Sequence, residues 1–429
     1  MKTTALRIYG KSDLRLETFE LPPLKDDEIL AEIVSDSVCM SSHKAAIQGA
    51  DHKRVPKDVA TNPTIIGHEF AGYIRQVGKK WADKFTVGHK FAIQPAMEYK
   101  GSLDAPGYSF RYIGGMANFI IIPSCVMECD CLLSYDGDAF FKASLSEPMS
   151  CIVGAVHAQY HTVHESYDPR MGIVAGGNCA ILAGAGPMGM GCIDYLVHGP
   201  RKPGLLVVTD IDRNRIERAR QLLTPEDAKR HSVELVYLDA SDASTAVARL
   251  RDLSKGKGYD DVFVFAPVAP VVEQADAILG RNGCLNFFAG PTKADFSARV
   301  NFYNVHYAGT HIVGTSGGNI DDMRESLELM SAGKIDPAAM ITHVGGITCG
   351  AHTILHLPEI PGGKKLLYVQ YDLPLVAISD FAELGKTDKF YAALAGMCDR
   401  HSGLWNAEAE EYLLKHAPKL DPGKVPVRS

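Results

Sequence analysis

The first 150 residues alternate between apolar and polar positions over short segments that Gly and Pro interrupt. Segments such as EILAEIVSDSV, FAGYIRQVG and ANFIIIPSC have this period of two, which is typical of short β-strands. Between about residues 155 and 315 the pattern changes, and apolar runs such as GLLVVTDID are followed by stretches with helical spacing. Strands that alternate with helices predict a parallel, doubly wound sheet.

We therefore expect an α/β protein in which a mostly-β domain is followed by a Rossmann-type domain. A chain of 429 residues is long for one hydrophobic core, which also favours two domains. The segment GGKKLLYVQYDLP predicts one more strand, and the residues after about 375 have helical spacing. The expected boundaries are 1–155 for the first part of the β domain, 156–315 for the Rossmann domain, 316–375 for a return to the β domain, and 376–429 for a helical C-terminal extension.

Composition and charge narrow the range of partners and locations. The 44 basic and 51 acidic side chains give a net charge of −7 with no basic block, so we expect no nucleic-acid partner. No apolar run is long enough to predict a membrane span. The N-terminal segment lacks the apolar core of a signal peptide, and the ten cysteines form no framework of pairs. These features predict a cytoplasmic protein.

A glycine-rich turn opens the predicted Rossmann domain. Its GxGxxG pattern would occur by chance roughly 0.3 times in a chain with this glycine content, so the pattern alone is weak. A strand precedes the turn, a helix-like run follows it, and Asp210 ends the next strand. In such a turn the helix N-terminus binds a diphosphate, and the acidic residue accepts hydrogen bonds from a ribose. The candidate cofactor-binding residues are Gly184, Gly186, Pro187, Met188, Gly189 and Asp210.

The acidic residue after the second strand also bears on the choice of cofactor. Asp210 favours NAD(H), because a carboxylate repels the 2′-phosphate of NADP(H). Arg213 and Arg215 lie nearby and could soften that exclusion, so Arg215 is a further candidate and NADP(H) stays open.

Several residues of the β domain could bind a metal ion. Cys39, His68 and Glu147 are a thiol, an imidazole and a carboxylate, a set that zinc accepts at catalytic sites with an open position. Glu69, next to His68, offers another carboxylate. Their spacing is not that of a zinc finger, and an isolated His–Glu pair is more often a core histidine than a ligand. The residues alone therefore leave both interpretations open.

The segment GHEFAGYIRQVGKKWADKFTVGHKFAI resembles the signature of zinc-dependent medium-chain alcohol and polyol dehydrogenases. A cysteine before this segment, and a Glu-Pro pair and the GxGxxG turn after it, complete the family's order. The resemblance covers about residues 1–375 and implies that the β domain is a GroES-like catalytic domain. It also implies that Cys39 and His68 are zinc ligands, with Glu147 or Glu69 as the third ligand.

The family's second zinc is structural and is held by four closely spaced cysteines. No cysteine lies between Cys39 and Cys125, so we expect one catalytic zinc and no structural zinc. The resemblance also implies that Ser41 hydrogen-bonds the substrate oxygen. The family's proton relay often ends at a His five residues after the Cys, whereas here that position is Lys44 and His43 comes one residue earlier. His43 is therefore a candidate catalytic residue. Glu69 is another, because the resemblance implies that Glu69 and Glu147 exchange at the zinc during turnover.

The segments SLSEPMSCIVGA and AEAEEYLLKHA resemble a bacterial branch of the family that acts on ketose phosphates. The resemblance implies hydride transfer between a nicotinamide and a ketose or polyol phosphate, from L-sorbose 1-phosphate to D-glucitol 6-phosphate. The phosphate would need cations, and the candidates are Lys44 and Arg111. Thr315 lies in GTSGGN, which aligns with the segment that approaches the nicotinamide in this family.

Two other functions stay open at this stage. The first is a dehydrogenase of unphosphorylated polyols such as sorbitol, which the zinc and cofactor residues cannot distinguish. The second is a zinc- and nucleotide-binding sensor without turnover, against which the complete set of candidate catalytic residues argues. We also expect a homo-oligomer, either a dimer or a tetramer.

Overall fold

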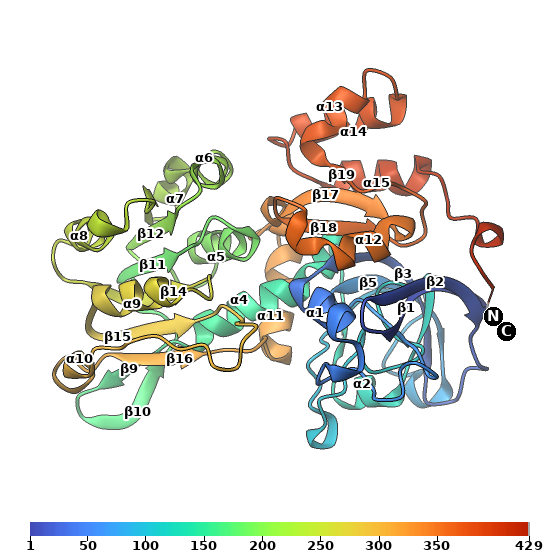
Figure 1. The fold of residues 1–429 in the computed structure, drawn as a ribbon, viewed down its shortest axis with the longest axis horizontal. Helices are drawn as coiled ribbons and strands as arrows, with labels where there is room; N and C mark the ends of the chain where they lie inside the picture. Colours follow the sequence, from blue (N-terminus) through green and yellow to red (C-terminus); the bar gives the residue numbers. More distant parts are fainter. Residues whose placement is uncertain (428–429) are drawn as a thin grey trace. The chain divides into compact units, whose positions relative to one another are not determined.

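The computed structural model describes residues 1–427, and the chain divides into two compact units (Figure 1). The first, here called the β unit, contains residues 1–147, 330–332 and the chain from residue 337 onward. The second, here called the nucleotide unit, contains residues 148–329 and 333–336. No helix within residues 1–427 is both long enough and apolar enough to span a membrane.

The nucleotide unit is built on one parallel sheet of six strands. Its spatial order is β13-β12-β11-β14-β15-β16, so the chain starts in the middle and winds outward in both directions, as the alternating pattern predicts. The central strands carry continuous apolar runs because both faces of the sheet are covered. The strands are β11 (Asn178–Leu182), β12 (Leu205–Asp210), β13 (Glu234–Asp239), β14 (Tyr259–Val264), β15 (Leu279–Phe287) and β16 (His311–Gly314).

The crossover helices of this unit begin at defined capping residues. Helix α5 (Pro187–His198) has Gly186 as its N-cap and a proline in its first turn. The side chain of Asp212 accepts hydrogen bonds from two backbone N–H groups at the start of α6 (Arg213–Leu222). Helices α8 (Ala243–Leu253) and α9 (Ala269–Ile278) follow β13 and β14.

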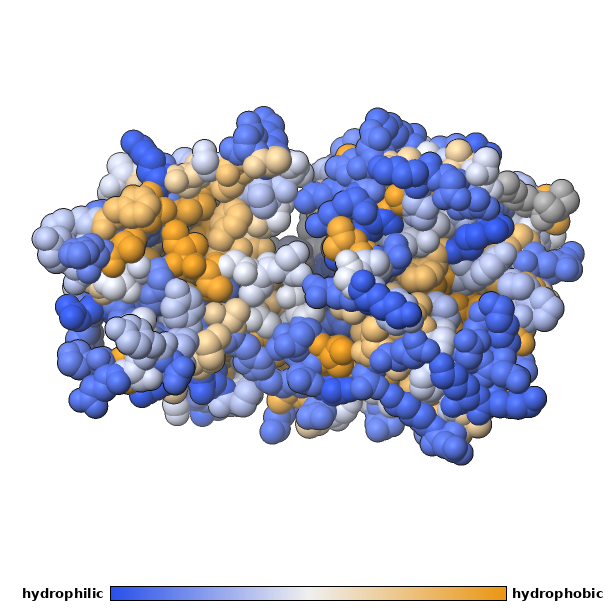
Figure 2. Space-filling view, turned by 90° about the horizontal axis from the view of Figure 1, so that it is seen from below, coloured by the Kyte–Doolittle hydropathy of each residue, from blue (hydrophilic) through white to orange (hydrophobic). Residues whose placement is uncertain are grey.

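One surface of the nucleotide unit is unusually apolar. Helix α10 (Phe302–Tyr307) leaves Phe302 77%, Tyr303 68% and Tyr307 63% exposed, and Ile312 in the edge strand β16 is 45% exposed. Apolar side chains gather on the face of the molecule that Figure 2 shows. A contiguous exposed patch of this kind marks an interaction site more often than a solvated surface.

The β unit contains an eight-stranded sheet with the order β19-β17-β18-β3-β5-β6-β8, in which β7 also pairs with β3. A smaller sheet has the order β2-β1-β4. The strands are β1 (Lys2–Gly10), β2 (Asp13–Glu20), β3 (Ile29–Val38), β4 (Thr64–Ile65), β5 (Phe70–Val77), β6 (Lys90–Ile93), β7 (Phe119–Ile122), β8 (Leu132–Ser134), β17 (Ile341–Gly346), β18 (Lys364–Tyr368) and β19 (Val376–Ala377). The antiparallel pairing of β3 with β18 joins an early and a late segment of the chain within the β unit.

The C-terminal extension is helical, as expected, and belongs to the β unit. It consists mainly of α13 (Phe381–Leu384), α14 (Lys389–Asp399) and α15 (Ala407–His416). Trp405 is fully buried, and its Nε1–H donates to Tyr368 Oη at 2.8 Å. The carboxylate of Glu410 in α15 accepts hydrogen bonds from the backbone N–H groups of Phe140 and Phe141 at 2.5 and 2.8 Å, and from Tyr368 Oη at 2.7 Å.

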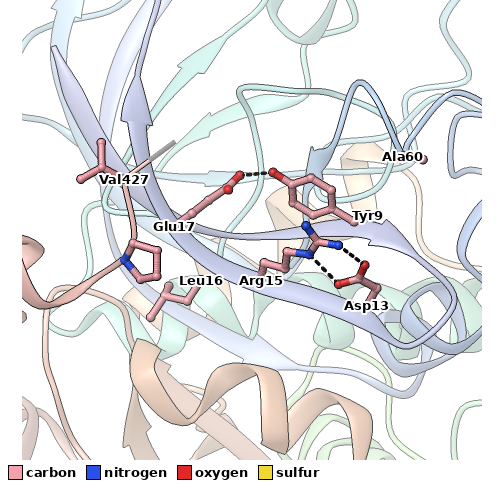
Figure 3. A pocket seen from close by; sticks show the side chains of 8 residues that line it. Tyr9, Asp13, Arg15, Leu16, Glu17, Ala60 and Val427 are labelled. Carbon is pink, nitrogen blue, oxygen red and sulfur yellow. Dashed lines mark hydrogen bonds and ion pairs between the residues drawn. The ribbon is translucent and has the colours of Figure 1, made fainter. Parts of the chain in front are cut away.

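Residues 426 and 427 lie beside β2 of the smaller sheet, here called the outer sheet. Thr18 of β2 donates its backbone N–H to the carbonyl of Pro426 at 2.9 Å. Together with Tyr9 and Arg15, this end segment lines a surface pocket of about 780 Å³ (Figure 3). The extension is therefore anchored at several points along its length rather than at one.

The buried Glu410 predicts a measurable pH dependence of stability. Burial raises the pKa of this carboxyl group from 4.5 to about 7, although its hydrogen bonds oppose the shift. The folded chain then holds a proton that the unfolded chain loses, so this contribution is complete below pH 4.5 and is lost as the pH rises through 7. Between pH 5 and pH 8 the free energy of unfolding of the wild type should fall by up to about 3 kcal/mol relative to that of Glu410→Gln, whose side chain cannot titrate.

The measurement compares the two proteins by chemical unfolding across this pH range. Because all other titrating groups are common to both, the difference between the two pH profiles isolates Glu410. Parallel profiles would contradict the assignment.

Candidate functional site

Three potential metal ligands meet at the end of two strands of the β unit. Cys39 follows β3 and is the N-cap of α1 (Met40–Gln48), and His68 and Glu69 lead directly into β5. One ligand atom from each of the three residues lies within 4.8 Å of the others. His68 and Glu69 are buried, with 3% and 0% exposure. A thiol, an imidazole and a carboxylate at these separations match the donor set of a catalytic zinc site.

Hydroxyl groups orient the imidazole of His68. Ser42 Oγ lies 3.0 Å from Nδ1, and on the other side Ser41 Oγ and Tyr108 Oη each lie 3.2 Å from Nε2. With Ser42 accepting from Nδ1–H, Nε2 is left as the ligating nitrogen. Ser41 Oγ is also 3.0 Å from Cys39 Sγ, so this hydroxyl lies between two of the candidate ligands.

The proton affinities of the cluster also suit a cation. Burial raises the pKa of the Cys39 thiol to about 12, and the negative charge of Glu69 adds to that shift. Burial also lowers the pKa of His68 to about 4, so its imidazole is neutral and can donate a lone pair. A thiol with its pKa raised this far stays protonated at neutral pH, and a metal ion that binds it displaces the proton. The residues present therefore fit zinc.

Glu69 has a second partner. Both of its carboxylate oxygens accept from Lys364 Nζ, at 2.6 and 2.7 Å, and both side chains are buried. Burial alone would lower the pKa of Lys364, but the charges of Glu69 and Cys39 outweigh it and raise this pKa. Asp36 also lies here, since its Oδ1 accepts from the backbone N–H of Glu69 at 3.2 Å.

Glu147 is the other candidate for the third zinc ligand. This residue lies in the first turn of α4 (Ser146–Ala158), and its negative charge acts on both Cys39 and Lys364. Its carboxylate is outside the group of ligand atoms within 4.8 Å, whereas Glu69 is inside the group but bound to Lys364. Glu69 and Glu147 both stay candidates for the third ligand.

His43, Lys44 and Arg111, which the sequence predicts to act on the substrate, have different surroundings. His43 Nδ1–H donates to the carbonyl of Ile354 at 2.9 Å, so this nitrogen is not turned toward Ser41. Lys44 is close enough for its charge to lower the pKa of His52. Arg111 is exposed, with its guanidinium 5.4 Å from the ring centroid of Tyr112.

Several residues around the cluster are not among those that the sequence predicts. Tyr108 contacts His68, and the ring of His52 stacks on Tyr108 at a centroid distance of 5.7 Å. The guanidinium of Arg54 lies 5.5 Å from the same Tyr108 ring. The basic run HKRVPK at residues 52–57 was the available signal for Arg54. Lys364 lies too far along the chain for any spacing pattern to connect it with Glu69.

The glycine turn of the nucleotide unit has the expected tight geometry. A Cβ atom on Gly189 would lie 2.0 Å from the carbonyl oxygen of Gly184, so only glycine permits this packing of α5 on β11. A Cβ atom on Gly186 would meet nothing within 4 Å, so the backbone there faces open space. The N-terminus of α5, with Pro187 and Met188 in its first turn, is therefore accessible to an anion.

The predicted selector residues around this turn are engaged with the protein itself. Asp210 is buried, and its carboxylate accepts from the backbone N–H groups of Ala185 at 3.1 Å and Ile211 at 2.8 Å. Arg215 lies 3.6 Å from Asp212. Thr315, in the segment expected near the nicotinamide, has a buried Oγ1 with no hydrogen-bond partner among residues 1–427.

Comparisons with known proteins agree with this geometry. Residues 25–129 match the alcohol dehydrogenase GroES-like domain, and residues 205–332 match the zinc-binding dehydrogenase domain. The chain is 50% identical over 418 residues to L-sorbose 1-phosphate reductase of Klebsiella pneumoniae, covering 97% of this chain and 98% of that protein. It is also 50% identical over 414 residues to mannitol-1-phosphate 5-dehydrogenase of Aliivibrio fischeri, covering 96% and 98%.

Solved structures show the same fold at lower identity. The 2R,3R-butanediol dehydrogenase of Bacillus subtilis superposes with a TM-score of 0.68 at 18% identity, covering 85% of this chain and 99% of that one. The expected GroES-like domain, Rossmann domain and helical extension are thereby confirmed.

The ligand cluster predicts the metal content of the chain. The wild type should contain about one zinc per chain, and Cys39→Ala should lose nearly all of it, because the soft anionic ligand is gone. Elemental analysis measures the metal, and binding of the reduced cofactor, followed by fluorescence, checks that the nucleotide unit is intact. Cys125→Ala, in α2 (Ser124–Glu128), is the matched control and should retain the zinc. Two tightly held zinc ions per chain, or full zinc content in Cys39→Ala, would contradict the prediction.

Proposed function

Because the chain belongs to the zinc-binding dehydrogenase family, we propose that it transfers a hydride between a nicotinamide cofactor and a ketose or polyol phosphate. The observation that carries the substrate class is that two relatives at 50% identity, each matched over nearly its whole length, are named for a sugar or polyol phosphate. Within that class we propose the reduction of L-sorbose 1-phosphate to D-glucitol 6-phosphate.

In this proposal Cys39 and His68 hold the zinc, together with Glu69 or Glu147. When bound, zinc supplies Lewis-acid polarisation of the substrate carbonyl. Ser41 holds the proton that the substrate oxygen receives, which its place beside Cys39 Sγ and His68 Nε2 supports. Ser42 fixes the ring orientation of His68.

The cofactor is NAD(H) in this proposal, bound along the glycine turn and the N-terminus of α5. Here Asp210 has two tasks: its carboxylate holds the turn through Ala185, and its charge disfavours a 2′-phosphate. Arg213 is less available to attract a 2′-phosphate than its sequence position suggests, because it is paired with Asp239 at 2.7 Å.

Replacing the Asp210 charge tests the cofactor preference. Asp210→Asn keeps an oxygen to accept from Ala185 but removes the like-charge repulsion, so the ratio of kcat/KM for NAD(H) over NADP(H) should fall by about tenfold. Asp252→Asn, an exposed residue near the end of α8, is the control and should leave the ratio unchanged. An unchanged ratio in Asp210→Asn would show that this residue is not the selector.

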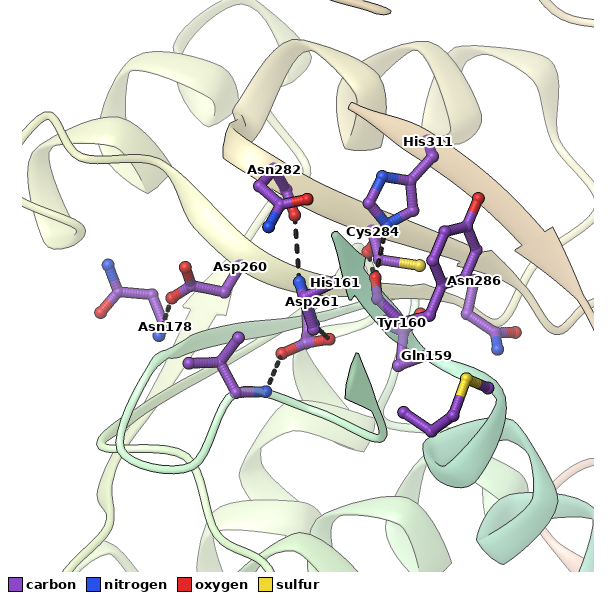
Figure 4. Close-up of polar contacts among 12 residues, drawn as sticks. Gln159, Tyr160, His161, Asn178, Asp260, Asp261, Asn282, Cys284, Asn286 and His311 are labelled. Carbon is purple, nitrogen blue, oxygen red and sulfur yellow. Dashed lines mark hydrogen bonds and ion pairs between the residues drawn. The ribbon is translucent and has the colours of Figure 1, made fainter. Parts of the chain in front are cut away.

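We also propose that the chain forms a homo-oligomer through the apolar surface of the nucleotide unit. Strand β16 is at the sheet edge, where its outer backbone groups lack a strand partner within the described chain. The edge is held firmly: His311 bonds the carbonyl of Tyr160, and His161 bonds both Asn282 and Asp261 (Figure 4). A rigid edge beside exposed aromatic side chains suits a second copy of the chain, in a dimer or as one contact of a tetramer.

A substrate panel tests the proposed function. L-sorbose 1-phosphate, D-fructose 6-phosphate, L-sorbose and D-fructose are compared by kcat/KM with both cofactors. We expect at least about tenfold preference for the phosphates, the scale of one lost charge-assisted hydrogen bond. Preference for the free sugars would replace the proposal by the unphosphorylated-polyol function. Absence of turnover with every member, by zinc-loaded protein, would favour the sensor.

A further inference from the structure

Arg54 is a cation placed next to the candidate zinc ligands. It lies in the loop that follows α1, and this loop is fixed against residues 105–109, since the Arg54 carbonyl accepts from Ser109 Oγ at 2.7 Å. Its guanidinium lies 5.5 Å from the ring centroid of Tyr108, and Tyr108 Oη is 3.2 Å from His68 Nε2. A single aromatic ring therefore separates this guanidinium from a candidate zinc ligand.

The fold provides no anionic partner for this guanidinium. Within residues 1–427 no carboxylate oxygen lies within 4.0 Å of Arg54, and its Nε is buried without a hydrogen-bond acceptor. Arg75 of the same unit is a useful contrast: its guanidinium also lies over a tyrosine ring, at 4.9 Å from Tyr73, but it is paired with Glu32 at 2.6 Å. Leaving a buried N–H without an acceptor is costly, so a half-buried arginine in this state is suited to receive one from a ligand.

The surroundings of Arg54 strengthen its preference for an anion. His52 stacks on the same Tyr108 ring and is half-buried. Burial first, and then the charges of Arg54, Lys53 and Lys44, lower the pKa of His52 to about 4. The three positive charges thus act in the same direction as burial. A doubly charged anion would be attracted to this position.

We propose that Arg54 is the residue that binds the substrate phosphate, and that it selects sugars whose phosphate is on the carbon next to the reacting carbon. This inference rests on the proposed function. The guanidinium is one aromatic ring from His68, which matches a phosphate on the neighbouring carbon, as in a 2-ketose 1-phosphate. A phosphate at the far end of a six-carbon chain, as in D-fructose 6-phosphate, lies much farther from the ketone. The planar fork of arginine binds phosphate oxygens in pairs and so fixes the orientation of the sugar.

Arg54, rather than Arg111, is then the arginine expected to bind the phosphate. Arg111 lies over Tyr112, which itself packs against Phe19 of the outer sheet. Arg54 instead shares Tyr108 with the ligand cluster. In this arrangement Arg54 determines specificity and Arg111 does not contact the phosphate.

The test measures four proteins against three substrates. Arg54→Ala should lower kcat/KM for L-sorbose 1-phosphate by about 10- to 150-fold and for free L-sorbose by less than about threefold. The loss with D-fructose 6-phosphate should be smaller than that with L-sorbose 1-phosphate. Arg54→Lys should recover part of the loss, since it keeps the charge but not the fork. Arg75→Ala is the matched control, and Arg111→Ala is the competing variant.

A binding measurement provides a readout independent of turnover. Inorganic phosphate should compete with the sugar phosphate in the wild type, and its inhibition constant should rise by a similar factor in Arg54→Ala. Melting temperature and zinc content are measured for every variant, so that a folding defect is recognised.

The outcomes separate the two hypotheses. If the wild type shows no preference for phosphates over free sugars, the proposed function fails before any variant is considered. If the preference is present but Arg54→Ala lowers kcat/KM equally for free and phosphorylated sorbose, Arg54 has only a structural role and the inference is overturned. A selective loss in Arg111→Ala with none in Arg54→Ala or Arg54→Lys would also overturn it.

Discussion

The buried ion pair between Glu69 and Lys364 is the interaction on which the rest of the candidate site depends. It joins the turn before β5 to the first residue of β18, 295 positions later, and it lies where burial would otherwise oppose both charges. Around it are the Cys39 thiol and the carboxyl groups of Asp36 and Glu147. Burial and the charge of Glu69 raise the pKa of Asp36 well above its usual range, which shows how little negative charge this region can hold alone.

This electrostatic situation explains why a divalent cation suits the site. Lys364 pairs with Glu69, while the Cys39 thiol and the carboxyl group of Asp36 are pushed toward their neutral forms by burial and by the charge of Glu69. A zinc ion bound to Cys39 and His68 would supply the missing positive charge. The same ion pair limits the freedom of Glu69, because a carboxylate that approaches zinc must share its oxygens with Lys364. An exchange of Glu69 with Glu147 at the zinc would therefore be a competition between two cations, zinc and Lys364, for the Glu69 carboxylate.

The sequence predicted those parts of the molecule that depend on local pattern. The strands of the nucleotide unit follow from continuous apolar runs, the GxGxxG turn from its glycines, and the Cys39 and His68 pair from a recognisable motif. The residues that complete the site are brought in by tertiary contacts that have no fixed spacing. Lys364, Tyr108 and Arg54 come from a distant strand and from two loops, and loops positioned by a rigid scaffold vary more than the scaffold itself. For the same reason the sequence predicts Lys44 and Arg111 as phosphate ligands but not Arg54, whose position beside Tyr108 is a tertiary contact.

The bond network of Glu410 has a consequence for how the chain folds during its synthesis. The amides of residues 140 and 141 are made early, but their acceptor is in α15, which leaves the ribosome only after the whole nucleotide unit has been translated. Domains generally fold as they emerge, in order from the N-terminus. The β unit cannot do so here, because β17, β18 and the buried Trp405 are also synthesised last. Residues 148–329 of the nucleotide unit are continuous, so they can fold on the ribosome before the segments of the β unit after residue 337 have been synthesised. Until then the first 147 residues lack the strands and helices that they pack against.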